Sequence, residues 1–506
     1  MSTKKIIDPL NRIEGDMAIE ITLNDSNVIT DAKSIGFVYR GFENIFIGQK
    51  PFDAMRMSQR SCGVCPVSHG YAGALAIESA ANFKVPRNAE LVRDIVLGAN
   101  HCVSHATHFY FMWGPDLVNE AYKDRPLYNE VLKRFDPLKS PHIKAILTEA
   151  RIPLHSVVAT FGGKFPHPMH AIPGGVCSIP KAIEMIKADT MVKEVRAFIE
   201  KEVLGGVSMD DWKKLRNVGD VLKLLENNKD FANSDLGVFI RYAQDIGLHK
   251  YNEGSPKNFL AYGFGHNKDG SWLFKPGYIE GGKFYEVDQK LINEDTSNSF
   301  YEPEVEWRHP SNGMTKPVPR RPGAYSWVKS PRYFGHVCEL GPLARQIVNN
   351  DPLITDLVKV FGVNTFTRVL ARLHEIVLLM PKITEWIAEI DLNKPFYYPF
   401  TDVKDGSGFG LTEASRGAVG HWINIKDGKV ASYQIITPSS WNCSPKDSKG
   451  QHSAIEQALI GVKLRNKDSI VEAGHIVRGF DPCISCSIHA VNAKKERIKV
   501  RIEPTD

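Results

Sequence analysis

Two Cys-x-x-Cys motifs near opposite ends of the 506-residue chain constrain its fold more than any other feature. The first spans residues 62–65 and is followed by His69, and the second spans residues 483–486 and is followed by His489. Two such pairs supply four thiolates, enough for a closed soft-metal site or a dinuclear one. Because the motifs come from both ends of the chain, they cannot belong to independent domains.

The composition is that of an ordinary soluble protein, with 42% hydrophobic and 24% charged residues. The net charge of +5 gives no reason to expect nucleic acid as a partner. Eight cysteines are too few for a disulfide scaffold in so long a chain. The first residues lack the apolar run of a signal peptide, and no uncharged apolar stretch reaches the roughly 20 residues that span a bilayer.

Hydrophobic patterning predicts an α+β fold, one large unit with a central helical bundle and small peripheral antiparallel β-sheets. The metal site is expected between the two Cys-x-x-Cys motifs. Alternation predicts hairpins over 17–38 and 422–436, with a glycine-rich loop at 406–410 and short strands over 250–325. Helical periodicity predicts helices over 72–118, 180–203, 212–248, 341–350, 364–390 and 453–462.

Three histidines, His101, His105 and His108, share a helical spacing that could bind zinc, but no third ligand accompanies them in the sequence. Packing in the core is therefore the simpler interpretation. The simple interpretation of Glu14 is a solvated residue at the edge of a strand. For the four cysteines the structural alternative is a Cys₄ zinc site, although such sites usually hold together much smaller modules.

Further motifs lie before the first cysteine pair, at residues 12–15 (Arg-Ile-Glu-Gly) and 40–43 (Arg-Gly-Phe-Glu). Others lie between the two pairs, at residues 162–164 (Gly-Gly-Lys), 166–168 (Pro-His-Pro) and 416–417 (Arg-Gly). With Arg60 before the first pair and Asp481 before the second, the chain resembles the large, catalytic subunit of nickel–iron hydrogenases. The resemblance runs from residue 8 to residue 489. It implies a hydrogenase domain over 1–489 and a C-terminal extension over 490–506 that is removed on maturation.

This resemblance implies a ligand set. Cys62 and Cys483 are expected as terminal thiolates on nickel, and Cys65 and Cys486 as bridges to an iron that carries carbon monoxide and two cyanides. Soft thiolates suit both metals. The family sometimes has selenocysteine at the position of Cys483, where this chain has cysteine.

The resemblance also assigns residues around the two metals. Arg416 is expected over the open side of the metal pair, and Ser439 is expected to hydrogen-bond a cyanide. Glu43, the carbonyl of Ile435 and the side chain of His489 are expected to hold a magnesium ion, with water as the remaining ligands.

The implied enzyme is an oxidoreductase that cleaves H₂ heterolytically, reversibly in principle and with uptake favoured. The base is the thiolate of Cys483 or the guanidine of Arg416, and the thiolate is preferred because arginine is a poor base. Glu14 would carry the proton onward. An H₂-sensing protein on the same fold is the alternative, whereas the quinone-reducing subunit of respiratory complex I would have lost the cysteines.

The other cysteines, Cys102, Cys177, Cys338 and Cys443, are isolated and are interpreted as buried apolar residues. With none left for iron–sulfur clusters, electrons are expected to pass to a separate iron–sulfur small subunit, in a heterodimer or larger complex. The resemblance also implies a maturation endopeptidase, nickel-insertion factors and an acceptor such as a membrane cytochrome b. We expect a membrane-associated protein that faces the periplasm through export with the small subunit, with a cytoplasmic location as the alternative.

Two positions depart from the family. Many members have aspartate where this chain has Ser104, and proline where it has Ser415. That aspartate helps to fix the arginine, and serine cannot form an ion pair. Arg416 is therefore expected to be held in a different way.

Overall fold

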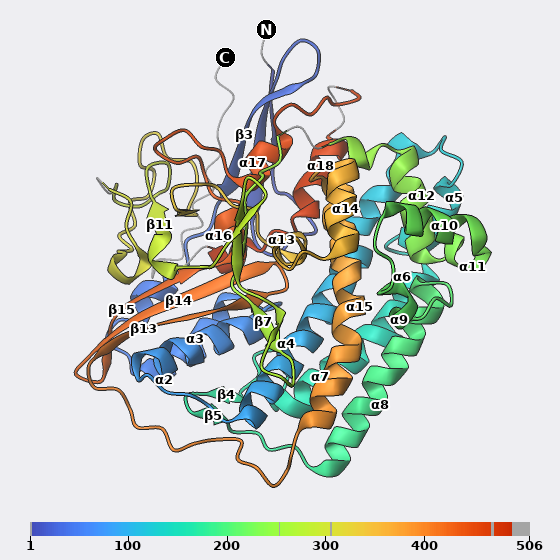
Figure 1. Ribbon diagram of the computed structural model, residues 1–506. Coiled ribbons are helices and arrows are strands. Elements are labelled where there is room, and N and C mark those ends of the chain that lie inside the picture. The colour runs from blue at the N-terminus through green and yellow to red at the C-terminus, as the bar shows by residue number, and fades with distance from the viewer. Residues whose placement is uncertain (1–2, 252–253, 304–305, 467–469, 488–506) are drawn as a thin grey trace.

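Four long helices form the centre of the fold, and each packs against two of the others (Figure 1). They are α4 (Arg87–Thr107), α7 (Ile152–Gly162), α8 (Ala182–Phe198) and α15 (Thr365–Glu389). The computed structural model describes residues 3–251, 254–303, 306–466 and 470–487, with residues 486 and 487 described by their backbone alone. Within these ranges, no helix is both long and apolar enough to cross a membrane.

Helix α15 shows why the bundle forms. It begins where the side chain of Asn364 accepts the Thr367 N–H and Thr367 bonds back to the Asn364 N–H, which together satisfy two backbone donors at the helix start. The apolar stripe predicted from the sequence is buried along its length: Leu370, Leu373, Ile376, Val377, Met380 and Ile383. The predicted helix over 364–390 is confirmed.

In the part of the chain that the structure describes, six small antiparallel sheets lie beside the bundle. Three have three strands: β1 (Thr3–Ile7), β2 (Met17–Leu23) and β3 (Ile29–Gly36); β10 (Lys283–Tyr285), β9 (Gly277–Glu280) and β6 (Phe259–Ala261); and β13 (Gly406–Ala414), β14 (Gly417–Lys426) and β15 (Lys429–Ile436). Three are two-stranded: β4 (Ala171–Ile172) with β5 (Gly175–Val176), β7 (Phe264–His266) with β8 (Trp272–Phe274), and β11 (Ile292–Asp295) with β12 (Ser330–Tyr333). Both predicted hairpins and the α+β class are confirmed.

The other α-helices lie around the bundle and between the sheets. They are α1 (Phe42–Ile45), α2 (Pro51–Ser58), α3 (Pro66–Ala80), α5 (Tyr128–Phe135), α6 (Pro141–Ala145), α9 (Met209–Trp212), α10 (Val218–Asn227), α11 (Lys229–Ala232), α12 (Asp235–Asp245), α13 (Pro342–Val348), α14 (Pro352–Phe361), α16 (Pro438–Asn442), α17 (Ala454–Leu459), α18 (Val471–Gly479) and α19 (Ile484–Ser487).

The glycine-rich segment at 406–410 is a strand, β13, and the prediction of a loop there is wrong. Its glycines allow the strand to lie directly on helix α3. A Cβ at Gly408 would stand 2.2 Å from the Ala76 carbonyl oxygen, and one at Gly410 would stand 2.0 Å from that of Ala72. Glycine is required here by close approach of two backbones. The contact fixes α3, the helix that begins at the first cysteine motif.

Two predicted helices are divided in the structure. The stretch over 212–248 contains α10, α11 and α12, because Asn217, Asn228 and Ser234 each cap a new helix within it. The stretch over 72–118 is split between α3 and α4, with Pro86 capping the second helix. Helices α5 to α7 were not predicted.

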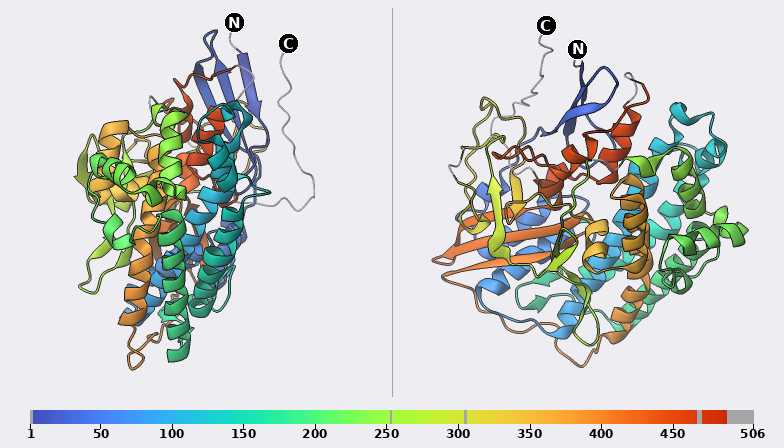
Figure 2. Two further views of the ribbon diagram at one scale, coloured as in Figure 1. Left: turned by 90° about the vertical axis from the view of Figure 1, so that its right-hand side faces the viewer. Right: turned by 45° about the horizontal axis from the view of Figure 1, so that its top comes forward.

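The two ends of the chain share one hydrophobic core. Apolar residues of β2, such as Ile19 and Ile21, belong to the same cluster as Ile455 of α17 and Ile476 of α18. Figure 2 shows the N-terminal strands beside these C-terminal helices. This packing carries the second cysteine motif, which follows α18, to the neighbourhood of the first.

Candidate metal centre

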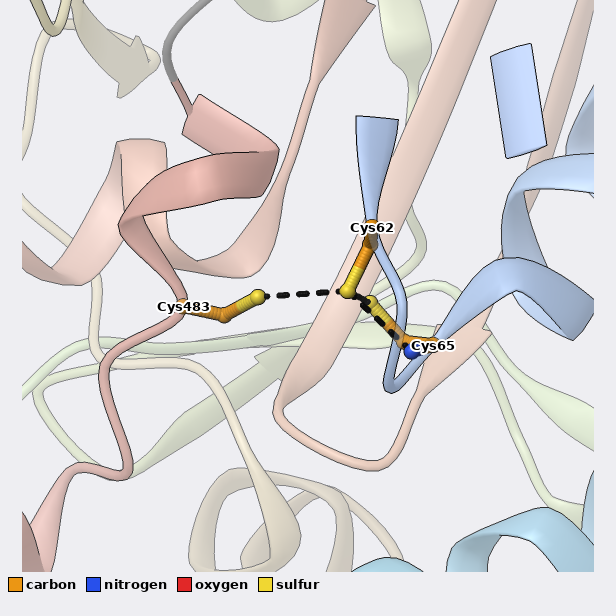
Figure 3. Close-up of side chains that lie close together, drawn as sticks. All are labelled: Cys62, Cys65 and Cys483. Carbon is orange, nitrogen blue, oxygen red and sulfur yellow. Dashed lines mark hydrogen bonds between the residues drawn. The ribbon is translucent and has the colours of Figure 1, made fainter. Parts of the chain in front are cut away.

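Three cysteine sulfurs from the two motifs converge in the interior (Figure 3). The Sγ of Cys62 lies 2.9 Å from that of Cys65 and 3.4 Å from that of Cys483. All three side chains are buried. We call these three residues the sulfur cluster. The side chain of Cys486, the predicted fourth ligand, and His489 lie outside the described residues.

The first motif is positioned by helix α3. Cys65 caps the helix and Pro66 occupies its first turn, where a missing N–H costs nothing. The N–H groups of Val64 and Cys65 both donate to the Sγ of Cys62, at 3.3 and 3.1 Å. The loop therefore directs two backbone donors and the start of a helix at the Cys62 sulfur.

The second motif is positioned by segments far away in sequence. The Cys483 N–H donates to the Oγ of Ser439 at 2.8 Å. The Glu14 N–H donates to the Pro482 carbonyl at 3.2 Å, and the Ile484 N–H donates to the Glu14 carbonyl at 2.7 Å. The loop around Glu14 therefore pairs with the cysteine motif like a short parallel strand.

Gly15 makes this pairing possible. Its φ is +87°, and a Cβ there would stand 2.5 Å from the Ser485 backbone nitrogen. Arg12, two residues before Glu14, has a left-handed backbone conformation. Glu14 itself is half-buried. Burial raises the pKa of its carboxyl, while Arg416 acts to lower it and the thiol of Cys65 acts to raise it. The interpretation of Glu14 as a solvated edge residue does not fit this environment.

Arg416 lies in the turn between β13 and β14 and is buried. Its Nε donates to the Asp481 carbonyl and its Nη2 to Asp481 Oδ1, both at 3.0 Å. Burial acts to lower the pKa of Arg416, but the negative charges of Asp481 and of the sulfur cluster outweigh it and hold that pKa well above its ordinary value. Arg416 is therefore a permanent cation beside the sulfurs.

The two departures from the family lie against each other. The Ser415 hydroxyl donates to the Oγ of Ser104 at 2.9 Å, and both side chains are buried. As predicted, no carboxylate at position 104 fixes Arg416. Asp481 binds the arginine instead, and its other oxygen lies 3.5 Å from Nη1 of Arg372.

The predicted magnesium ligands Glu43 and Ile435 are neighbours. The Ile435 N–H donates to Glu43 Oε1 at 2.9 Å, and the hydroxyl of Thr315 donates to Glu43 Oε2. Lys329 Nζ lies 3.4 Å from that second oxygen and donates to Gln434 Oε1 at 2.6 Å. The Glu43 carboxylate and the Ile435 carbonyl are hard oxygen donors of the kind that magnesium prefers, although Lys329 shares the charge of that carboxylate.

A second buried group of possible ligands was missed by the sequence analysis. Glu375 of α15 faces two histidines of α4, with its Oε1 2.9 Å from His105 Nε2 and 3.3 Å from His101 Nδ1. The conclusion that no third ligand accompanies these histidines is wrong, because helix periodicity does not show which residue a distant helix contributes. His108 is not part of this group, since its Nε2 lies 2.7 Å from the Arg478 carbonyl oxygen.

The remaining cysteines divide into two kinds. Cys102, Cys338 and Cys443 are buried, as predicted, and burial raises the pKa of each thiol above its ordinary range. Cys177 is exposed, and the prediction of a buried residue is wrong there. It follows strand β5 in the loop that leads to α8.

Thiol sulfurs brought together from both ends of a large α+β chain, with an arginine and a carboxylate beside them, offer a buried site for a soft metal. The donor set fits nickel and iron, which bind soft thiolate ligands. The chain belongs to the nickel-dependent hydrogenase family, whose model matches residues 40–125 and 142–489. It is the large subunit of a nickel–iron hydrogenase, an oxidoreductase.

Known relatives match almost the whole chain. The periplasmic [NiFeSe] hydrogenase large subunit of Desulfomicrobium baculatum is 33% identical, over 96% of this chain and 95% of the relative. The hydrogenase-1 large chain of Escherichia coli is 29% identical over the same shares. The structure of the reduced Ni-Fe-Se hydrogenase from D. vulgaris Hildenborough superposes with a TM-score of 0.82 at 30% identity, covering 97% of this chain and all of that one.

Proposed function

We propose that this large subunit cleaves H₂ heterolytically at the sulfur cluster and passes two electrons, one at a time, to an iron–sulfur small subunit. The observation that carries the proposal is the joining of both cysteine motifs in one buried cluster beside a charged arginine and a half-buried carboxylate. The bound nickel–iron pair would supply the acceptor for the hydride and its electrons.

The chain's own residues would handle the proton. We assign the base to the thiolate of Cys483, because Arg416 beside it is held as a cation and cannot accept a proton. Arg416 would orient H₂ and balance the charge of the thiolates. Glu14 would take the proton onward, since its backbone pairs with that of Cys483 and its raised pKa brings it closer to that of a thiol.

The remaining ligand roles follow the donors that are present. Cys62 and Cys483 would bind nickel, and Cys65 and Cys486 would bridge it to the iron that carries carbon monoxide and two cyanides. The Oγ of Ser439 accepts from the Cys483 N–H, which leaves its own proton to donate to a cyanide.

Magnesium would be held beside this centre by Glu43, the carbonyl of Ile435 and His489. Removal of residues 490–506 by the maturation endopeptidase, after nickel-insertion factors have acted, would leave the hydrogenase domain over 1–489 with His489 as its last residue. An oxygen-rich set with one imidazole is compatible with the octahedral preference of magnesium.

The names of relatives support the choice of partners. Several are called large subunits or large chains, which implies a small subunit beside them. An uptake hydrogenase large subunit of Afipia carboxidovorans is 29% identical, and a quinone-reactive Ni/Fe-hydrogenase large chain of Wolinella succinogenes is 27% identical. We propose that this chain also works in the uptake direction, with a membrane cytochrome b as acceptor, facing the periplasm through export with its small subunit.

Isotope exchange tests heterolysis without any electron acceptor. The purified large and small subunit complex is supplied with D₂ in ordinary water, and the gas phase is followed by mass spectrometry. Heterolytic cleavage exchanges the deuteron held by the base first, so HD is expected as the early product. D₂ that is consumed once an electron acceptor is added, with no HD formed before it, would contradict the proposal. Neither exchange nor consumption of D₂ in nickel-loaded protein would favour the sensor alternative.

A further inference from the structure

Arg345, on helix α13, is the centre of a fully buried ionic group. Its Nε and Nη2 bind the two carboxylate oxygens of Glu375 at 2.9 and 2.6 Å, and its Nη1 binds Glu413 Oε2 at 2.6 Å. None of the three side chains is exposed to solvent. We call Arg345, Glu375, Glu413, His101 and His105 the arginine cluster.

The same guanidinium also hydrogen-bonds the backbone next to the sulfur cluster. Nη1 donates to the Ala414 carbonyl at 3.0 Å, and Nη2 donates to the Ser415 carbonyl at 3.1 Å. These are the two carbonyls directly before Arg416, the arginine beside the sulfur cluster. Only a guanidinium has enough donors in one plane to bind two carboxylates and two carbonyls together.

The start of helix α13 supports the other side of this turn. A Cβ at Gly417, whose φ is +130°, would stand 2.8 Å from the Gly341 nitrogen and 2.8 Å from the Cβ of Leu340. Gly341 caps the helix that carries Arg345. The turn that presents Arg416 is therefore held between the first residues of α13 and a side chain from the same helix.

The histidines anchor this arrangement to the central bundle. Glu375, on α15, bridges Arg345 to His101 and His105 on α4. Burial lowers the pKa of His105 to about 4, even though Glu375 acts to raise it, so the imidazole is neutral. The arginine cluster connects two bundle helices to the Arg416 turn through a single cation.

We propose that Arg345 is a positioning residue that fixes the place of the Arg416 guanidinium over the metal centre. This inference rests on the proposed function only in taking Arg416 to act in H₂ cleavage. Arg345 makes no contact with the sulfur cluster among the described residues, and its effect on the reaction passes through the backbone of residues 414–416.

The first test is Arg345→Lys, compared with Arg93→Lys as a matched control. Arg93 is equally buried, pairs with both oxygens of Glu78 and donates to the carbonyls of Ile172 and Gly175, but it lies beside the far end of α3 from Cys65. We expect Arg345→Lys to retain nickel and to lower kcat by about 10- to 100-fold, because a shift of about 1 Å in a positioned group has effects of this size. The control should match it in thermal midpoint while keeping the wild-type kcat.

A double-mutant cycle distinguishes positioning from a general structural defect. In an Arg416→Lys background, Arg345→Lys should cause no further loss of kcat, because the group on which it acts has been replaced. The inference would be overturned if the double variant lost kcat by the product of the two single losses, or if Arg345→Lys alone kept the wild-type kcat. Wild-type activity in Arg416→Lys alone would instead show that the proposed role of Arg416 is wrong.

Arg345→Lys could fail to fold, because a lysine leaves part of two buried carboxylates without a partner. The variant Arg345→Met with Glu375→Gln and Glu413→Gln removes the charges together and keeps the volume. This triple variant should fold and retain nickel, and its kcat should fall by about 10- to 100-fold, the loss expected for Arg345→Lys. A wild-type kcat in this triple variant would contradict the positioning role.

Discussion

The sulfur cluster and the group formed by His101, His105 and Glu375 look alike as ligand sets. Each offers three possible metal ligands within 4.8 Å of one another, and each is buried. They differ in their neighbouring arginine. Arg345 binds both oxygens of Glu375, whereas Arg416 directs its hydrogen bonds at Asp481.

This difference decides what each group can do. A carboxylate whose oxygens are bound by a guanidinium is already neutralised, and a metal would have to displace or repel that cation. In the sulfur cluster the arginine lies beside the thiols but directs its hydrogen bonds to Asp481 and not to a sulfur, so the sulfur atoms are available to a soft metal. Three possible ligands that lie close together form a metal site only if their donor atoms are not already bound by a neighbouring guanidinium.

The largest effect is expected from the replacement of one sulfur. Cys62→Ser should abolish nickel binding and all hydrogenase activity, because a hydroxyl is a hard and poorly ionised ligand. His105→Gln, the matched change in the other group, should leave the nickel content unchanged. Elemental analysis of the two purified variants measures this, and loss of nickel in His105→Gln alone would reverse the comparison.

Glu14→Gln should lower turnover by about 10²- to 10⁴-fold, the usual contribution of a positioned proton-transfer group. The amide keeps the shape of the side chain and the backbone pairing with Cys483, so nickel content should not change. Steady-state H₂ oxidation and metal analysis of the same sample check both points. Turnover close to wild type would remove Glu14 from the proton path.

Acid should destabilise the protein through its buried neutral histidines. Burial lowers the pKa of His105 and His475 to about 4 and that of His108 and His170 to about 3. The unfolded chain therefore binds these protons first, so their stabilisation is complete above about pH 6.5 and is lost as the pH falls from there toward 4. Each histidine contributes about 1.4 kcal/mol per pH unit in that window.

Thermal midpoints recorded between pH 7 and 5 measure this slope. His105→Gln should reduce the slope of stability against pH by about 1.4 kcal/mol per pH unit, the contribution of one proton, because the amide cannot be protonated in either state. An unchanged slope in that variant would mean that His105 binds protons equally in the folded and unfolded states, which would contradict a lowered pKa in the folded protein.

The smallest effect is expected at the pair of serines. Ser104→Ala leaves the buried Ser415 hydroxyl without its acceptor and should cost about 1–3 kcal/mol of stability. Adding Ser415→Ala should restore most of that loss, since neither hydroxyl then needs a partner. Thermal unfolding of the single and double variants provides the comparison, and equal losses in both would show that the hydroxyl pair is not coupled.

Much of the centre could be predicted from the sequence because its chemistry lies in short motifs. Cys62, Cys65, Cys483, Glu14 and Arg416 stand in local patterns and lie together in the structure, and Glu43 lies beside Ile435. The apolar stripe of α15 was equally clear, since it repeats at helical spacing.

The supporting residues could not be predicted, because they act across long distances in the chain. Arg345, Glu375 and Lys329 are single charged residues without a motif. Only the packing of α13, α15 and the segment that leads into β12 against distant elements shows their partners. Strand β13 was missed for a related reason. Its glycines signal a loop in isolation and a close helix contact only when α3 is known to lie beneath them.

Nickel X-ray absorption spectroscopy on the purified complex tests the central claim most directly, because it counts the sulfur and nitrogen atoms bound to the metal. The sulfur cluster with its fourth cysteine predicts a first shell of thiolate sulfurs and no imidazole scattering. A shell that contains imidazole nitrogens, and loses them in His105→Gln, would place the metal in the other group and contradict the account.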